Sequence, residues 1–143
     1  MNLQILYSKI EQYAMNTQTV QSVTFLSPYL VWNSKHISYP CFSANLERVS
    51  YTDNTIEYHF QFVYGGKLTN DSSNVFELQN TAFIVIRNVI NHLKDEFGMD
   101  AIETTDIYPF QQSFSDVLAG GYADITIYTP MDDLDCEGFD KEQ

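Results

Sequence analysis

The stretch from Ile56 to Gly98, IEYHFQFVYGGKLTNDSSNVFELQNTAFIVIRNVINHLKDEFG, contains a strand pattern followed directly by a helix pattern. Between Ile56 and Leu68 apolar and polar side chains alternate, which predicts a half-buried antiparallel strand. Its apolar face holds Ile56, Tyr58, Phe60, Phe62 and Tyr64, and its polar face holds Glu57, His59 and Gln61. The Gly65-Gly66 pair predicts a bulge or kink near the end of this strand.

A long helix is predicted between Asn74 and Phe97. Asn74 is a suitable N-cap, and Glu77 three residues later approximates a capping box. Apolar residues then recur at helical spacing over about six turns, and Gly98 can adopt the left-handed conformation that ends a helix. Three additional apolar residues widen the stripe beyond what one sheet face requires: Phe83, Ile84 and Ile90. Either a contact with another subunit or enclosure within the domain explains them.

Three elements are predicted on the N-terminal side of this stretch. Leu3 to Ala14 carries one apolar stripe at helical spacing, which predicts an amphipathic helix. The region from Val20 to His36 predicts a short strand and a long loop. Ser38 to Tyr51 is predicted to be a strand that bends or restarts at Pro40, and a turn at Thr52 to Thr55 joins it to the alternating strand.

Two strands are predicted after the long helix. The first runs from Ala101 to Tyr108 and is ended by Pro109, and the second runs from Tyr122 to Thr129. Between them Ala119-Gly120-Gly121 predicts a flexible turn. The order of helix, hairpin, long helix and hairpin predicts an α+β fold, in which an antiparallel sheet carries its helices on one face.

The length and net charge of the chain limit the number of domains and the kinds of partner that we expect. A chain of 143 residues fits a single domain, which we place at residues 1–130, followed by an acidic tail at residues 131–143. The formal net charge of −12 repels the phosphates of nucleic acids, so we expect no direct DNA binding. We also expect a soluble protein without a signal peptide or membrane span, with Cys41 and Cys136 as thiols in a reducing cytoplasm.

The sequence offers no convincing metal, cofactor or catalytic motif. The histidines and cysteines (His36, His59, His92, Cys41 and Cys136) lack the paired spacing of a zinc site. The tail resembles only the first half of a calcium loop, and Gly120-Gly121 precedes a strand, which is the wrong side for binding a phosphate. Asp116 and Asp124 are better explained as a turn cap and a strand surface position than as catalytic carboxylates. Ser113 and Ser115 have no nearby His in the sequence and no motif of an activated nucleophile. We therefore expect no cofactor, no metal and no enzymatic activity.

One sparse pattern of residues gives an indication of function as well as of fold. It comprises Tyr108-Pro109-Phe110, Phe114-Ser115-Asp116, Ala119-Gly120-Gly121, Ala123 to Ile127, Thr129-Pro130-Met131 and Asp135-Cys136, together with Asn74 and its helix. This pattern resembles the ring or tail-completion proteins of crAss-like and other Bacteroidetes-infecting tailed phages. The resemblance covers roughly Phe62 to Cys136.

The resemblance implies a tail-terminator-like fold and a structural virion protein without enzymatic activity. It implies six or twelve copies in a homo-oligomeric ring at the head-tail connector, in contact with portal and adjacent neck and tail proteins, while DNA passes through without specific binding. An acidic adaptor or inhibitor that mimics DNA is the alternative. The tail either docks on a neighbouring protein or forms part of a negative lumen, and its apolar residues Leu134 and Phe139 favour docking.

Overall fold

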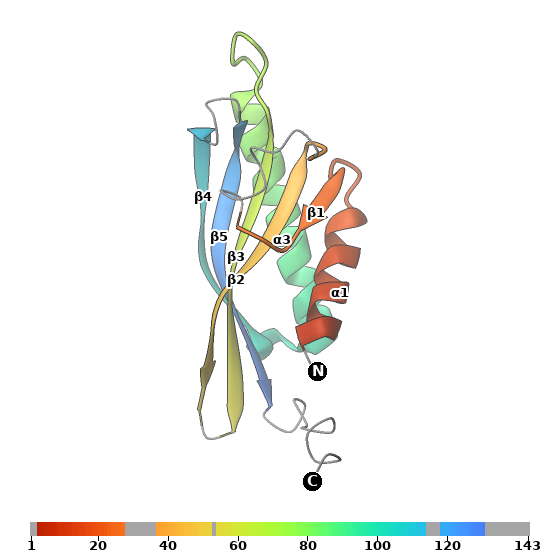
Figure 1. Ribbon diagram of the computed structural model, residues 1–143, viewed down its shortest axis with the longest axis vertical. Coiled ribbons are helices and arrows are strands. Elements are labelled where there is room, and N and C mark those ends of the chain that lie inside the picture. Colours follow the sequence, from red (N-terminus) through yellow and green to blue (C-terminus); the bar gives the residue numbers. More distant parts are fainter. Residues whose placement is uncertain (1–2, 28–36, 53, 114–117, 131–143) are drawn as a thin grey trace.

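The computed structural model describes residues 3–27, 37–52, 54–113 and 118–130, and confirms the α+β class (Figure 1). Its elements in chain order are α1 (Leu3–Met15), β1 (Ser22–Thr24), β2 (Cys41–Tyr51), β3 (Thr55–Lys67), α3 (Val75–Phe97), the 3-10 turn η1 (Met99–Ala101), β4 (Ile102–Ser113) and β5 (Leu118–Pro130). The predicted acidic tail, and with it Leu134 and Phe139, lies outside the described residues.

The strands form one five-stranded sheet in the order β1-β2-β3-β5-β4. The sheet is mixed, because β1 pairs with β2 in parallel while the other neighbours are antiparallel. The expectation of a purely antiparallel sheet was therefore wrong. Residues 25–40 separate β1 from β2, and a connection of this length allows the chain to return to the same end of the sheet, as parallel pairing requires.

The core lies between the sheet and the two helices, which cover the same face (Figure 1). The predicted alternation of β3 is confirmed, because its apolar face from Ile56 to Tyr64 is buried to 2% exposure or less. β5 adds Ala123, Ile125 and Ile127 to the same layer. The helices contribute Leu6, Ile10 and Ala14 from α1, and Ala82, Val85, Ile86, Val89, Ile90 and Leu93 from α3. Each large apolar side chain buried here contributes roughly 1.5–3 kcal/mol.

The two helices also contact each other directly. Lys9 of α1 forms an ion pair with Glu96 of α3, with 3.1 Å between Nζ and Oε1. The ring of Tyr13 stacks on His92, with 5.1 Å between the ring centroids. His92 therefore lies at the contact between the helices, and α1 covers one flank of α3.

The ends of α3 only partly follow the sequence signals. Asn74 occupies the N-cap position but makes no capping hydrogen bond, so the predicted capping box was wrong. Its side chain instead fixes the preceding loop, because it accepts a hydrogen bond from the backbone N–H of Thr69 at 2.9 Å and donates one to the carbonyl of Lys67 at 3.0 Å. Gly98 ends the helix at the predicted residue, and its φ of 106° favours glycine, but its ψ of 151° is not that of the predicted left-handed helical conformation.

Both glycine pairs lie inside continuous strands, so neither the predicted bulge nor the predicted flexible turn is present at these residues. Gly65 pairs with Gly120 and Tyr64 pairs with Gly121 without a break in register. The glycines are needed for close approach. A Cβ at Gly121 would lie 3.2 Å from the Cβ of Ala82 in α3, and a Cβ at Gly120 would overlap the carbonyl oxygen of Tyr64.

The prediction that Pro109 ends its strand was wrong, whereas the start of β2 agrees with the break predicted at Pro40. β4 continues through Pro109, which pairs with Gly121, rather than ending there. Proline is tolerated because β4 is an edge strand, where one side of the backbone needs no partner. β2 begins directly after Pro40, whose peptide bond with Tyr39 is cis.

Neither α1 nor α3 combines the length and hydropathy that a membrane-spanning helix requires, a finding that holds for the described part of the chain.

The glycine packing makes a graded prediction. Gly120→Ala should destabilise the domain by about 1–3 kcal/mol or more, because the new methyl group meets rigid backbone. Gly121→Ala should cost less, since its nearest neighbours begin at 3.2 Å and can shift slightly. Chemical denaturation of both variants measures the order, and equal stabilities would contradict the close packing described here.

Candidate functional site

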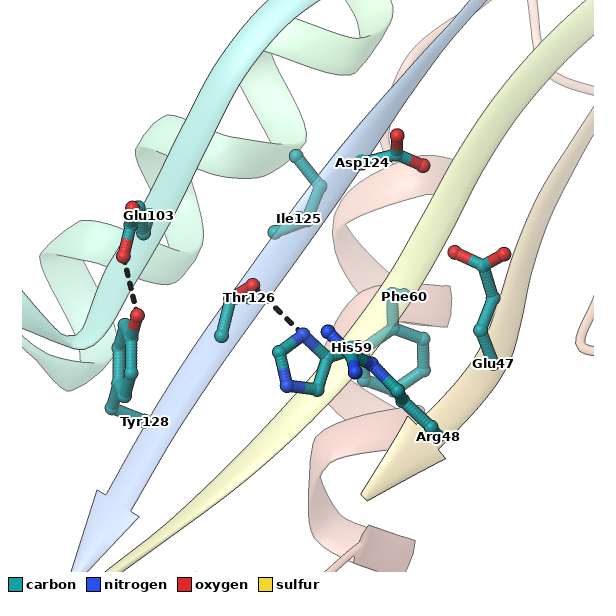
Figure 2. Close-up of a pocket in the computed structure, with 9 residues that line it drawn as sticks. All are labelled: Glu47, Arg48, His59, Phe60, Glu103, Asp124, Ile125, Thr126 and Tyr128. Atoms are coloured by element: carbon teal, nitrogen blue, oxygen red, sulfur yellow. Dashed lines mark hydrogen bonds between the residues drawn. The ribbon is translucent and has the colours of Figure 1, made fainter. Parts of the chain in front are cut away.

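The face of the sheet opposite the helices carries polar and charged side chains, and no helix of the described residues covers it (Figure 1). An open depression of about 410 Å³ lies on this uncovered face (Figure 2). It is lined by Glu47, Arg48, His59, Phe60, Glu103, Asp124, Ile125, Thr126 and Tyr128. The lining comes from β2, β3, β4 and β5, so the depression depends on the order of the strands in the sheet.

A β-bulge in β2 brings two consecutive charges to the depression. Leu46 pairs with Phe60 and Arg48 pairs with His59, which leaves Glu47 as the extra residue. In a regular strand neighbouring side chains point to opposite faces, but a bulge breaks this alternation. Glu47 and Arg48 therefore both line the depression (Figure 2).

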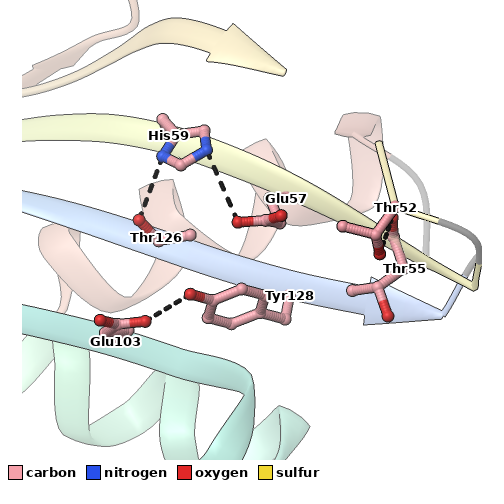
Figure 3. Close-up of polar contacts among 7 residues, drawn as sticks. All are labelled: Thr52, Thr55, Glu57, His59, Glu103, Thr126 and Tyr128. Carbon is pink, nitrogen blue, oxygen red and sulfur yellow. Dashed lines mark hydrogen bonds and ion pairs between the residues drawn. The ribbon is translucent and has the colours of Figure 1, made fainter. Parts of the chain in front are cut away.

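The register between β3 and β5 places His59 beside Thr126. Nδ1 of His59 lies 3.2 Å from the hydroxyl of Thr126, and Nε2 lies 3.9 Å from Oε1 of Glu57 (Figure 3). The imidazole is thus held between a hydroxyl and a carboxylate on the surface of two neighbouring strands.

Tyr128 and Glu103 form the second polar pair of this face. The Tyr128 hydroxyl donates a hydrogen bond to Oε2 of Glu103 across β5 and β4 (Figure 3). This hydrogen bond, together with burial and the negative charges of Glu103 and Glu57, raises the pKa of Tyr128 to about 12. The phenol therefore stays protonated and fixes the carboxylate.

Burial and neighbouring carboxylates raise the pKa values of two groups on the uncovered face. Partial burial, followed by the charge of Asp124, raises the pKa of Glu47. The charge of Asp106, with smaller contributions that include Asp124, raises the pKa of Tyr108 near the same edge. Three carboxylates (Glu47, Glu103 and Asp124) and one arginine (Arg48) line the depression, so carboxylates outnumber permanent cations around it.

The upper end of the same face is apolar. Cys41, Val63 and Leu118 are buried together there, with Tyr39, Phe110, Tyr122 and Ile37 packed against them. The rings of Tyr108 and Tyr122 stack at a centroid distance of 5.4 Å, and Tyr108 remains 44% exposed. Along β5 the face thus changes from aromatic at Tyr122 to acidic at Asp124.

The described residues of this face do not form a hydrogen-bonded catalytic triad. Thr126, His59 and Glu57 have the order of a nucleophile, a base and a carboxylate, but 3.9 Å is too long for the hydrogen bond that would orient the base. Within the described residues no three His, Cys, Asp or Glu side chains gather closely enough to hold a metal ion.

The residues predicted for an interface differ in how far they are buried in the structure. Ile90 is 4% exposed and belongs to the core, so its own domain explains it and we remove it from the interface hypothesis. Phe83 is half-buried, and Ile84 is 40% exposed on α3. Leu134 and Phe139 lie outside the described residues, as do His36, Ser115, Asp116 and Cys136.

Sequence reasoning placed His59 and Asp124 on strand surfaces, and the structure agrees. It did not connect them with Glu47, Arg48, Glu103 and Tyr128. The alternation in β5 was a usable signal for Tyr128, because it lies on the same face as Asp124 and Thr126.

No protein-family model matches this sequence, and comparison with curated proteins likewise finds no match.

Partial burial of Glu47 and the charge of Asp124, which together raise its pKa, predict a stabilising substitution. Glu47→Gln should raise the free energy of unfolding at neutral pH by a few tenths of a kcal/mol, because the pair is mostly exposed. A carboxyl with a raised folded pKa contributes stability below its unfolded pKa and loses it as the pH rises. The advantage of the variant should therefore disappear below the ordinary value of 4.5. Urea denaturation at several pH values tests this, with Glu11→Gln on α1 as the control; a variant less stable than wild type at pH 7 would contradict it.

Tyr128 should lose its phenolic proton at a higher pH than an ordinary tyrosine. In a spectrophotometric titration at high pH, the difference between wild type and Tyr128→Phe should show one phenol with a pKa of about 12 rather than the ordinary 10.0. Replacing Glu103 with Gln should bring this titration back toward the ordinary value, since the hydrogen bond to the carboxylate is the largest cause of the shift. A phenol of Tyr128 that titrates at its ordinary value in wild type would show that the hydrogen bond does not form in solution.

Proposed function

We propose that this chain is a structural virion protein of a tailed phage and forms a homo-oligomeric ring of six or twelve copies at the head-tail connector. The ring is part of the DNA conduit between portal and tail. The fold is tail-terminator-like, the protein is not an enzyme, and it is made in the cytoplasm of the host bacterium before it enters the particle.

The observation that carries the proposal is the two-sided construction of the domain. Helices of the same chain cover one face of the sheet, whereas the other face is free of helices in the described residues and combines aromatic and acidic side chains (Figure 1). A ring needs two different surfaces on each subunit, because its contacts are head to tail. The helical layer and the uncovered face supply two such surfaces.

The residues that carry the phage resemblance support a structural role. Those that the structure describes fall on α3, β4 and β5, which form a continuous part of the fold in which α3 lies over adjacent strands. Gly120 and Gly121 allow close packing, and Tyr108 stacks on Tyr122. The described positions of the pattern therefore act through packing, which agrees with a family defined by its fold rather than by a reaction.

The charge of the chain suits a conduit. A net charge of −12 discourages packaged DNA from adhering to the wall of the channel. The acidic tail from Met131 to Gln143 is proposed either to dock on an adjacent neck or tail protein through Leu134 and Phe139 or to add to a negative lumen.

Electron microscopy of the purified protein, alone and mixed with the portal protein of the same phage, tests the proposal. Closed rings of six or twelve copies are expected, at least when portal provides a template. A protein that stays monomeric or dimeric with portal, yet captures a basic partner, would instead favour the acidic adaptor, because the chain has a net charge of −12 and carboxylates outnumber permanent cations around the depression.

A further inference from the structure

The solvent-facing side of α3 carries a stripe that differs from the rest of this acidic chain. Phe76 is 79% exposed and Ile84 is 40% exposed, while Arg87 is exposed and Lys94 is half-buried. Spacings of eight, three and seven residues keep these four side chains within about a quarter of the helix circumference. We call them the α3 ridge. It is apolar toward the N-terminus of the helix and basic toward the C-terminus.

The charges of the α3 ridge have no ion-pair partner among the described residues. The cation of α1, Lys9, is paired with Glu96, but no such pair involves Arg87 or Lys94. The acids Glu77 and Asp95 of α3 lie about a quarter turn or more from the two cations, toward the flank that α1 covers. The ridge is therefore a basic surface on a chain whose net charge is −12.

The uncovered face of the sheet has the complementary sequence of side chains. Along β5 it passes from Tyr122, which stacks on Tyr108, to Asp124 and then to Thr126, whose partner in β4 is Glu103. The face is thus aromatic at the level where the ridge is apolar, and acidic farther along.

The heights of these groups can be compared, because α3 and β5 run in the same direction and Ala82 lies over Gly121. At about 1.5 Å per helical residue, Ile84, Arg87 and Lys94 lie about 3, 8 and 18 Å beyond that point. At about 3.3 Å per strand residue, Tyr122, Asp124 and Thr126 with Glu103 lie about 3, 10 and 17 Å beyond it. Apolar groups therefore face aromatic ones, and cations face carboxylates, when two copies stand at equal height.

We propose that the α3 ridge of one copy docks on the uncovered face of the next copy, with Arg87 opposite Asp124 and Lys94 opposite Glu103. This inference rests on the proposed ring and names its contact. Rotation about a ring axis parallel to the strands keeps every subunit at the same height, which is the condition under which the groups match. Ile84 and Phe76 cover the aromatic end of the face. The basic side chains lie over the β5–β4 side of the depression, which carries Asp124 and Glu103, and away from Arg48 on β2.

Charge reversal tests the contact. Arg87→Asp and Asp124→Arg should each weaken self-association by about tenfold or more, because each places like charges opposite one another. The double variant should regain much of the association. Glu11→Arg on α1 is the control for a reversal outside both surfaces, and thermal unfolding of each variant shows that it remains folded. Analytical ultracentrifugation with and without portal is the measurement.

A disulfide-trapping experiment fixes the direction of the contact. In a Cys136→Ser background, a mixture of Arg87→Cys and Asp124→Cys proteins should form a crosslinked dimer on oxidation, whereas either protein alone should not. Crosslinking of the single proteins to the same extent would show a symmetric contact and overturn the proposal.

The outcomes separate this contact from the proposed function. Wild-type rings that survive both reversals overturn the contact and leave the ring in place. Reversals that abolish portal binding but not self-association identify another protein as the occupant and also overturn it. A wild-type protein that does not self-associate even with portal overturns the ring and the contact together.

Discussion

The packing of α3 against the centre of the sheet is the constraint on which the rest of the structure depends. The helix can approach β5 closely because Gly121 presents no side chain beneath Ala82 and Phe83. The large apolar side chains of β3 and β5 then fill the space along the rest of the helix, and α1 closes the flank through Lys9 and Glu96. Since one layer of helices holds most of the apolar material, the opposite face is polar except for the cluster around Cys41, Val63 and Leu118.

Local patterns in the sequence were sufficient to predict the helices and strands that bury one apolar face. The alternation from Ile56 to Tyr64 and the helical spacing from Val75 to Phe97 both follow from the need to bury an apolar face, so they could be predicted with nearly correct ends. Gly65-Gly66, Gly120-Gly121 and Pro109 were misread for a common reason. Each has a local meaning as a turn or a stop, but here each is decided by a neighbouring element that the local sequence does not reveal.

For His59 and Asp124, the sequence predicts which face of the sheet each side chain occupies. It does not predict that these residues lie close to the other residues of the depression. The side to which His59 and Asp124 point follows from the period of two in their strands. Their proximity to Glu103 and Glu47 requires that β3 and β5, separated in the chain by α3, pair in one particular register. The bulge that brings Glu47 and Arg48 to the same side carries no glycine or proline and has no visible mark in the sequence.

Pro109 affects how readily the edge of this sheet can pair with a strand of another copy. The free edge of β4 would ordinarily offer a row of backbone donors and acceptors to any other exposed strand, which is how sheets extend into fibres. Pro109 removes a donor from the middle of that edge, register shifts on both sides of it disturb the spacing of the remaining groups, and the other edge of the sheet is the three-residue strand β1. Neither edge is a good template for another strand. Unlimited growth by strand addition is therefore disfavoured at both edges of the described sheet, which leaves its side chains as the main groups for an ordered contact between copies.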